Sequence, residues 1–152
     1  MSGFSGSKGE QVLFSQNRVL VPFDFSEEST EALEKTLAFV GEATHLYVIH
    51  VLPQLNVGEP GVMYQTTNDR TRKQHVEKVF WETFGDRCYQ GLHLHVAIGD
   101  PSAAIVDYAK AQEIELIVIP SHGRTGLRRF LLGSVAERVI RFARCPVLVL
   151  RK

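Results

Sequence analysis

The feature that most constrains the fold is the segment 115–150, in which two apolar runs enclose a glycine-punctuated loop. The first run, 116–119, ends at a proline, and the second, 147–150, follows one. A helical pattern opens between them at Gly133-Ser134. The order strand, glycine loop, helix start, strand is typical of α/β domains that offer backbone N–H groups to a phosphate. The segment therefore predicts a site for an anion, and a nucleotide is the first candidate.

Apolar runs alternate with helical patterns along the rest of the chain. We expect strands at 18–22, 46–52, 92–98, 116–119 and 147–150, and helices at about 27–40, 68–84, 101–112 and 134–143. Such alternation implies an open, mostly parallel sheet covered by helices on both faces. The nearly unbroken apolar runs of the last two strands agree, because strands buried on both faces need no polar alternation.

Composition predicts one globular domain. Formal net charge is zero and 44% of residues are hydrophobic, which argues against a disordered chain. Residues 1–16 are rich in Gly and Ser and are expected to form a mobile N-terminal arm, with 17–152 as the single domain.

No apolar run approaches the ~20 residues that span a bilayer, and the N-terminus lacks the apolar core of a signal peptide. Cys88 and Cys145 lack metal-site spacing, so we expect reduced thiols in a cytoplasmic protein without a membrane partner.

Charge is divided unevenly along the chain. Residues 121–152 contain eight Lys or Arg and one acid, a net charge of +7, whereas the preceding 120 residues have nine basic and sixteen acidic residues, a net charge of −7. A basic segment around the glycine loop suits an anion site. Arg138, Arg141 and Arg144 recur at helical spacing and are interpreted as a solvated helix face. A nucleic-acid partner would require a more basic domain than a pI near 7.0 provides.

The glycine spacing carries a family resemblance. Gly123 is followed by nine residues and then by Gly133-Ser134. This resembles the Gly-x2-Gly-x9-Gly-Ser/Thr pattern of the nucleotide-binding branch of the universal stress proteins, with Pro120 at the first glycine. Further matches occur in order from about Arg18 to Lys152. They are Val21-Pro22-Phe23-Asp24-Phe25-Ser26, Ile49-His50-Val51, Gly99-Asp100-Pro101 and Cys145-Pro146-Val147-Leu148-Val149.

The resemblance implies a fold and a ligand. It implies the strand order 3-2-1-4-5 of a Rossmann-like sheet, similar to the adenine nucleotide alpha hydrolases, in which the winding reverses between the first and fourth strands. Ligands of open α/β sheets bind at such a switch point. The implied ligand is ATP, with or without Mg²⁺, and the implied role is stress-response regulation. The implied binding residues are Pro22, Phe23, Asp24, Val51, Ser121, His122, Gly123, Arg124, Gly133, Ser134 and Val135.

Four of these residues also have an ordinary structural explanation. Asp24 would accept hydrogen bonds from ribose hydroxyls, as the family aspartate does, or it closes the strand as an Asx turn. Ser134 would donate to a phosphate oxygen, or it is an N-cap. Gly123 permits close approach of a ligand, or it forms a plain turn. By the resemblance Val51 touches adenine, and otherwise it belongs to the core. Arg124 lies within the loop and is a phosphate candidate.

Other patterns carry less weight. Ser121-His122 suggests a nucleophile and a base, but adjacent residues rarely aim at one another and no third group is placed by the sequence. His93 and His95 share one strand face, but no further metal ligand is identifiable. The Walker pattern GxxxxGK and the dinucleotide pattern GxGxxG are both absent.

Three functions fit these patterns. The leading one is an ATP-binding regulator, because no acid, base or water-positioning group for phosphoryl transfer is visible. The second is a slow ATPase or nucleotidyl-transferring enzyme that uses His122 or Asp24. The third is a dimeric interaction module that has lost nucleotide binding, which Pro120 makes credible. A homodimer is expected in any case, through the apolar edge strand formed by Val147, Leu148, Val149 and Leu150.

Overall fold

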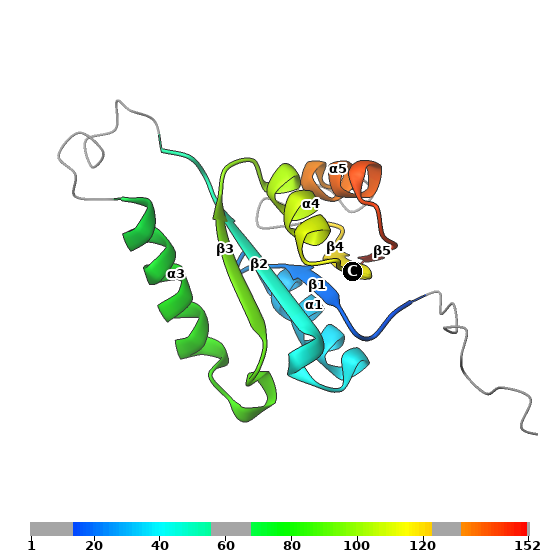
Figure 1. The fold of residues 1–152 in the computed structure, drawn as a ribbon, viewed down its shortest axis with the longest axis horizontal. Coiled ribbons are helices and arrows are strands. Elements are labelled where there is room, and N and C mark those ends of the chain that lie inside the picture. The colour runs from blue at the N-terminus through cyan, green and yellow to red at the C-terminus, as the bar shows by residue number, and fades with distance from the viewer. Residues whose placement is uncertain (1–13, 56–67, 123–131, 152) are drawn as a thin grey trace, which may run out of the picture.

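The fold is an alternating series of strands and helices (Figure 1). The computed structural model describes residues 14–55, 68–122 and 132–151. The strands are β1 (Val19–Pro22), β2 (Leu46–Leu52), β3 (His93–Ile98), β4 (Leu116–Pro120) and β5 (Val147–Leu150). The helices are α1 (Glu27–Val40), α3 (Asp69–Phe84), α4 (Pro101–Ala111) and α5 (Ser134–Phe142), with short 3-10 turns η1 (Ala43–His45) and η2 (Arg87–Tyr89).

The five strands form one parallel sheet in the order β3-β2-β1-β4-β5. Val19 of β1 is paired with Leu46 on one side and with Leu116 on the other. The chain therefore builds outward from β1 to β3 and then returns to continue on the opposite side of β1. This order confirms the one implied by the family resemblance, and it creates a switch point between β1 and β4.

Helices cover both faces of the sheet (Figure 1). On each face a hydrophobic cluster lies between the strands and the helices that cover them. Val19 and Val21 of β1 pack into the cluster shared with α1 and α3. Leu20, between them, packs into the cluster shared with α4 and α5. Successive strand residues point to opposite faces, so a strand between two helical layers must be apolar at every position. This is why the central strands read as unbroken apolar runs.

Helix boundaries follow capping residues that the sequence displays. Ser26 accepts a hydrogen bond from the Ser29 N–H at the start of α1, and Gly41 ends that helix with φ 78°. Asn68 caps α3, which therefore begins one residue later than expected. Asp100 caps α4 through the Ala103 N–H at 3.0 Å. Each cap supplies an acceptor, or a left-handed residue, that the free helix end requires.

Strand β4 extends one residue further than expected, to Pro120, which is buried and paired with Leu150. The N–H groups of Ile117 and Ser121 donate across to β5, at 3.0 and 2.9 Å. The residue between Ile119 and Ser121 therefore directs its nitrogen towards β1, beyond the point where the β1–β4 pairing ends. Proline lacks an N–H, and at this position the sheet loses no hydrogen bond.

The first described residues already contact the domain. Ser15 donates its hydroxyl hydrogen to Glu115, and the Gln16 amide donates to the Phe39 carbonyl at 2.8 Å. Among the helices in the described ranges, none combines the length and the apolar character needed to cross a membrane.

Candidate functional site

The candidate site lies where the carboxyl ends of β1 and β4 reach the same edge of the sheet. Phe23 and Asp24 follow β1, and Ser121 and His122 follow β4. The start of α5 is fixed beside them, because the Gly133 N–H donates to the Ser121 carbonyl at 2.8 Å. The tertiary structure thus gathers residues from distant parts of the chain at the switch point.

Helix α5 begins with a glycine cap. Gly133 is the N-cap residue, with φ −62° and ψ 151° and no side-chain cap bond. The first hydrogen bond of the helix runs from the Glu137 N–H to the Gly133 carbonyl at 2.9 Å. The N–H groups of Ser134, Val135 and Ala136 consequently have no acceptor within the helix. Ser134 is exposed and occupies the first helical position, so the explanation of Ser134 as the N-cap is wrong.

Close packing explains the glycine. A Cβ atom at Gly133 would lie 3.0 Å from the Ser121 carbonyl oxygen and 3.7 Å from the His122 Cα. The helix start therefore lies so close to the end of β4 that a side chain at Gly133 would require a shift of a few tenths of an ångström. The free N–H groups and the positive end of the helix dipole are held at the switch point, where an anion would be stabilised.

Ser121 and His122 contact one another, contrary to the expectation that neighbours in sequence would not. The Ser121 hydroxyl lies 3.1 Å from His122 Nδ1. His122 Nε2 is buried and has no hydrogen-bond partner among the described residues. An unpaired ring nitrogen beside the start of α5 is a group that a bound ligand would satisfy. In the described part of the chain, no carboxylate orients this ring as in a catalytic triad.

Asp24 forms the Asx turn that was one of its two explanations. Its Oδ1 accepts hydrogen bonds from the Ser26 N–H, at 3.0 Å, and from the Ser26 hydroxyl. The Asp24 N–H donates to Ser29 Oγ at 3.3 Å. The carboxylate is therefore fixed in orientation at the carboxyl end of β1. An Asx turn and a ligand contact are compatible, because a carboxylate offers about four lone-pair positions.

The other predicted residues on this side of the sheet divide between core and edge. The ring of Phe23 is buried between the rings of Phe80 and Phe84, each with its centroid 5.5 Å away. Only the backbone of Phe23 is thus available at the edge. Pro22 is half-buried and paired with Ile49. Val51 packs against the α4–α5 cluster while remaining partly exposed, so its contact with adenine stays a prediction.

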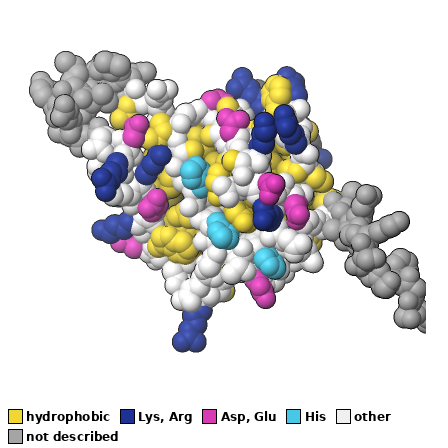
Figure 2. Space-filling view, in the orientation of Figure 1, with side chains coloured by type: hydrophobic (Ala, Val, Ile, Leu, Met, Phe, Trp, Pro, Cys, Tyr) yellow, Lys and Arg dark blue, Asp and Glu magenta, His cyan; other side chains and the backbone are white. Residues whose placement is uncertain are grey.

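The predicted loop residues Gly123 and Arg124 lie outside the described residues, as do Arg128, Arg129 and most of the loop after Pro53. On α5, Arg138 lies 3.8 Å from Asp100 and Arg141 lies 2.9 Å from Glu137, all with exposed side chains. Lys and Arg side chains gather over the region of α4 and α5 in Figure 2. The interpretation as a solvated helix face agrees with these contacts for Arg138 and Arg141. It is wrong for Arg144, which is exposed but follows the end of α5.

Asp100 is tied into the cap of α4. The Ala103 N–H, the Ser102 hydroxyl and the charge of Arg138 all lower the pKa of Asp100 from its usual value. The carboxylate therefore stays ionised to a lower pH than an ordinary aspartate. Its exposed ion pair with Arg138 joins α4 to α5.

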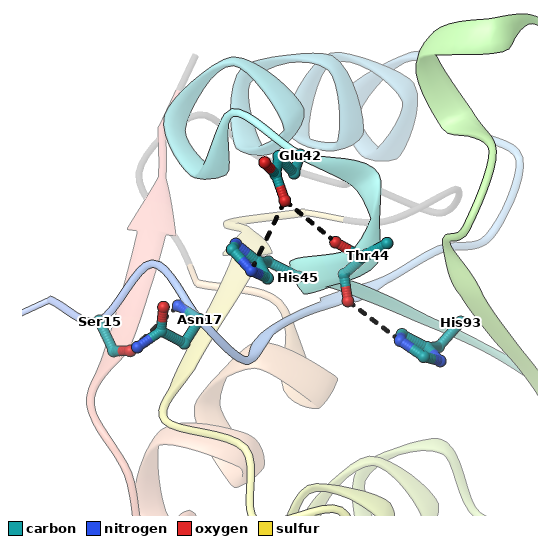
Figure 3. Close-up of polar contacts among 6 residues, drawn as sticks. All are labelled: Ser15, Asn17, Glu42, Thr44, His45 and His93. Carbon is teal, nitrogen blue, oxygen red and sulfur yellow. Dashed lines mark hydrogen bonds and ion pairs between the residues drawn. The ribbon is translucent and has the colours of Figure 1, made fainter.

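His93 and His95 have partners that leave the metal alternative without support. Figure 3 shows His93 beside the Thr44 carbonyl, to which its Nε2 donates at 3.0 Å. The His93 ring also stacks on Tyr47, and the His95 ring stacks on Tyr108 at 4.5 Å. Burial lowers the pKa of His95. Within the described ranges, no group of three or more His, Cys, Asp or Glu residues is placed to hold a metal ion.

Two residues near the site carried no functional prediction. His50 Nδ1 lies 2.7 Å from the Phe23 carbonyl. Phe25 adopts a positive φ of 63°, which is uncommon outside glycine. Nothing in the local sequence signals either feature. The His50 contact in particular joins residues 27 positions apart.

The fold and the site define an open parallel α/β protein with a candidate anion site at its switch point. The family model described as "Universal stress protein family" matches residues 16–151, and the chain belongs to this family. The family predicted from the glycine spacing is therefore confirmed.

Relatives and solved structures agree with this assignment. Universal stress protein MJ0531 of Methanocaldococcus jannaschii is 33% identical over 144 residues, which cover 89% of this chain and 82% of the relative. Protein YxiE of Bacillus subtilis is 30% identical and is covered over 99% of its length, against 89% of this chain. The structure of MJ0577, also from M. jannaschii, is 29% identical with a TM-score of 0.71, covering 93% of this chain and 98% of that one. MJ0577 supports placement in the nucleotide-binding branch.

Proposed function

We propose that this chain binds an adenine nucleotide at the switch point, with ATP as the expected ligand, and serves as a nucleotide-gated regulator of stress responses. One observation carries the proposal. The glycine-capped start of α5 is packed against the end of β4, with 3.0 Å between a hypothetical Gly133 Cβ and the Ser121 carbonyl oxygen. Free N–H groups at a helix start are a ready phosphate site. The two free cysteines suit a reducing compartment such as the cytoplasm.

The remaining groups fit the other parts of a nucleotide. Phosphates would meet the N–H groups of Ser134 and Val135, together with the Ser134 hydroxyl. The ribose would lie near the fixed carboxylate of Asp24, and adenine near Val51 at the end of β2. Mg²⁺ would enter with the phosphates, since it is usually bound by one or two carboxylates and by substrate oxygens.

Proteins with this fold have been solved with adenine nucleotides. One universal stress protein was crystallised with cAMP, and a family member from Arabidopsis thaliana with AMP, with TM-scores of 0.64 and 0.59 and 19% identity each. At that identity the similarity establishes the fold alone. These proteins nevertheless demonstrate that the fold accommodates the class of ligand proposed for this chain.

A regulatory role is favoured over efficient catalysis. Phosphoryl transfer needs a group that positions the attacking water, and the His122 ring has no orienting carboxylate in the described part of the chain. The Ser121–His122 contact at 3.1 Å is nevertheless a specific reason to test slow ATP hydrolysis. Multiple turnovers that disappear in His122→Ala would establish the enzyme alternative.

The proposal is tested by calorimetric titration of the purified chain with ATP, AMP and GTP, with and without Mg²⁺. Ligand released by denaturing protein purified from cells identifies the nucleotide carried in vivo. Substituting Gly133→Val together with Ser134→Ala should abolish binding, because it blocks the helix start and removes a donor. Thermal unfolding of the variant controls for loss of fold. If the wild type binds no ATP at millimolar concentration, the proposal is wrong, and an interaction module without nucleotide becomes the better description.

A further inference from the structure

The turn that carries Asp24 is held from β2 by a single histidine. The Phe23 N–H donates to the Ile49 carbonyl at 2.8 Å, which extends the pairing of β1 and β2 one residue beyond β1. The next residue of β2, His50, places Nδ1 2.7 Å from the Phe23 carbonyl. Since a carbonyl only accepts, Nδ1 must carry the hydrogen, which assigns the tautomer of the neutral ring.

The same ring supports the other flank of Asp24. Phe25 has φ 63°, a left-handed conformation that is unfavourable for a residue with a side chain. Its ring packs edge-on against His50, at 5.2 Å between centroids, and against Phe23 at 4.8 Å. His50 thus hydrogen-bonds the residue before Asp24 and packs against the residue after it.

A strained residue persists only where the surrounding structure over-determines it. Asp24, between these two contacts, is oriented by its Asx turn with Ser26. His50 can therefore affect the affinity for a ligand without contacting it, because it fixes the backbone from which the Asp24 carboxylate projects. A carboxylate oriented before binding loses less freedom when it accepts a hydrogen bond.

We infer that His50 is a positioning residue for Asp24. Its Nδ1–H bond to the Phe23 carbonyl holds the aspartate in the geometry that binds the ribose of the nucleotide, and its packing on Phe25 is secondary to that bond. The inference rests on the proposed function and deepens it. It assigns part of the nucleotide affinity to a side chain that faces the α1–α3 layer, on the same face of β2 as Val48.

The test uses two substitutions that separate the hydrogen bond from the ring. His50→Phe keeps an aromatic ring against Phe25 and removes the donor, whereas His50→Asn keeps a donor near Nδ1 and removes the ring. We expect His50→Phe to weaken ATP binding on the order of tenfold and His50→Asn to remain within about threefold of the wild type. His75→Phe, at an exposed histidine of α3, is the matched control and should bind like the wild type.

A double-mutant cycle distinguishes positioning from general destabilisation. If His50 acts through Asp24, then His50→Phe has no further effect on affinity in an Asp24→Ala background. A full additional loss in that background would overturn the inference. Equal losses in His50→Phe and His50→Asn, or none in His50→Phe, would overturn it as well. Thermal unfolding checks that each variant is folded during the titration.

Nitrogen NMR of His50 in the ligand-free protein supplies a measurement that requires no variant. A hydrogen on Nδ1 is expected, and a neutral ring protonated only at Nε2 would contradict the geometry. The same titrations distinguish failure of the proposed function from failure of this inference. If the wild type does not bind ATP, both proposals are wrong. If the wild type binds ATP and His50→Phe binds it equally well, only the role of His50 is wrong.

Discussion

Pro120 occupies the position at which the family pattern has its first glycine. Its nitrogen faces β1 beyond the last paired residue of that side, which is the direction of the switch point. A residue with an N–H there would have a free donor at the edge of the candidate site. Proline removes this donor and fixes φ near −65°, without removing any hydrogen bond from the sheet.

Pro120→Gly should therefore tighten ATP binding. A charge-assisted hydrogen bond to phosphate contributes about 1.5–3 kcal/mol, which corresponds to roughly ten- to a hundredfold in affinity. Calorimetric titration measures the change. Pro146→Gly, at an exposed proline before β5, is the control and should leave affinity unchanged. Equal or weaker binding by Pro120→Gly would show that no phosphate approaches this position.

Asp24 combines two roles that can be separated by the choice of substitution. Asp24→Asn retains an oxygen that accepts from the Ser26 N–H and so preserves the turn. Asp24→Ala removes both the turn acceptor and the ligand acceptor. We expect Asp24→Ala to weaken ATP binding by about 1–3 kcal/mol and to destabilise the fold by about 1 kcal/mol.

Asp24→Asn should keep the wild-type unfolding temperature and still lose affinity, because the amide is a weaker acceptor than a carboxylate. Denaturant unfolding and calorimetry, performed on the same samples, give both quantities. Unchanged affinity in both variants, in a protein that otherwise binds ATP, would leave Asp24 as a turn residue only.

At the scale of elements, the contact between α5 and β4 decides how the helix start is presented. The hypothetical Cβ at Gly133 is 3.0 Å from the Ser121 carbonyl oxygen, and that carbonyl already accepts from the Gly133 N–H. Gly133→Ala would have to push the helix start away from the strand end by a few tenths of an ångström. The backbone φ of −62° is itself acceptable for alanine, so the effect is steric.

We expect Gly133→Ala to destabilise the fold by roughly 1–2 kcal/mol and to weaken nucleotide binding together with it. Ser134→Ala, one residue later and exposed, should leave stability almost unchanged while it reduces affinity. Thermal unfolding with and without ATP compares the two variants. Full stability and affinity in Gly133→Ala would indicate that the helix start tolerates a shift.

At the scale of the whole molecule, β5 is an edge strand with an apolar sequence. The Pro146 and Leu150 carbonyls accept hydrogen bonds from β4. The alternating residues Val147 and Val149 therefore direct their backbone groups to the open edge. Leu148 adds an exposed apolar side chain, at 36% of its full exposure. Among the described residues no strand pairs with this side of β5, and an unpaired apolar edge is a template for another strand.

The chain should accordingly form a homodimer through β5, and Val149→Pro should make it monomeric. Proline there removes an outward N–H without disturbing the pairing with β4, whereas Val149→Ala keeps the N–H and should remain dimeric. Light scattering at micromolar concentration, with and without ATP, measures the mass. A monomeric wild type in both conditions would contradict the prediction.

Much of the fold was predictable because its determinants are local or periodic. Ser26 and Asp100 cap helices through bonds to residues three positions away, and Gly41 ends α1 by its own backbone conformation. The unbroken apolar run of β4 identified a strand buried on both faces. The same interpretation is wrong for β5, which lies at the sheet edge and has no fully buried residue. The strand order required the family resemblance, because hydrophobic periodicity does not distinguish one neighbour of β1 from another.

The candidate site was predictable only in its components. The glycine spacing and the residues after β1 and β4 indicated which segments would meet at the switch point. The Ser121–His122 contact, the close packing of Gly133 on β4 and the His50 bond to Phe23 were decided by the tertiary structure. For Gly133 and His50 the physical cause is sheet register and helix placement, which set the distances between atoms far apart in sequence. The Ser121–His122 contact joins sequence neighbours and depends on how the two side chains are oriented at the end of β4. The sequence alone determined which chemical groups reach the site, and only the packed sheet decided which of them contact one another.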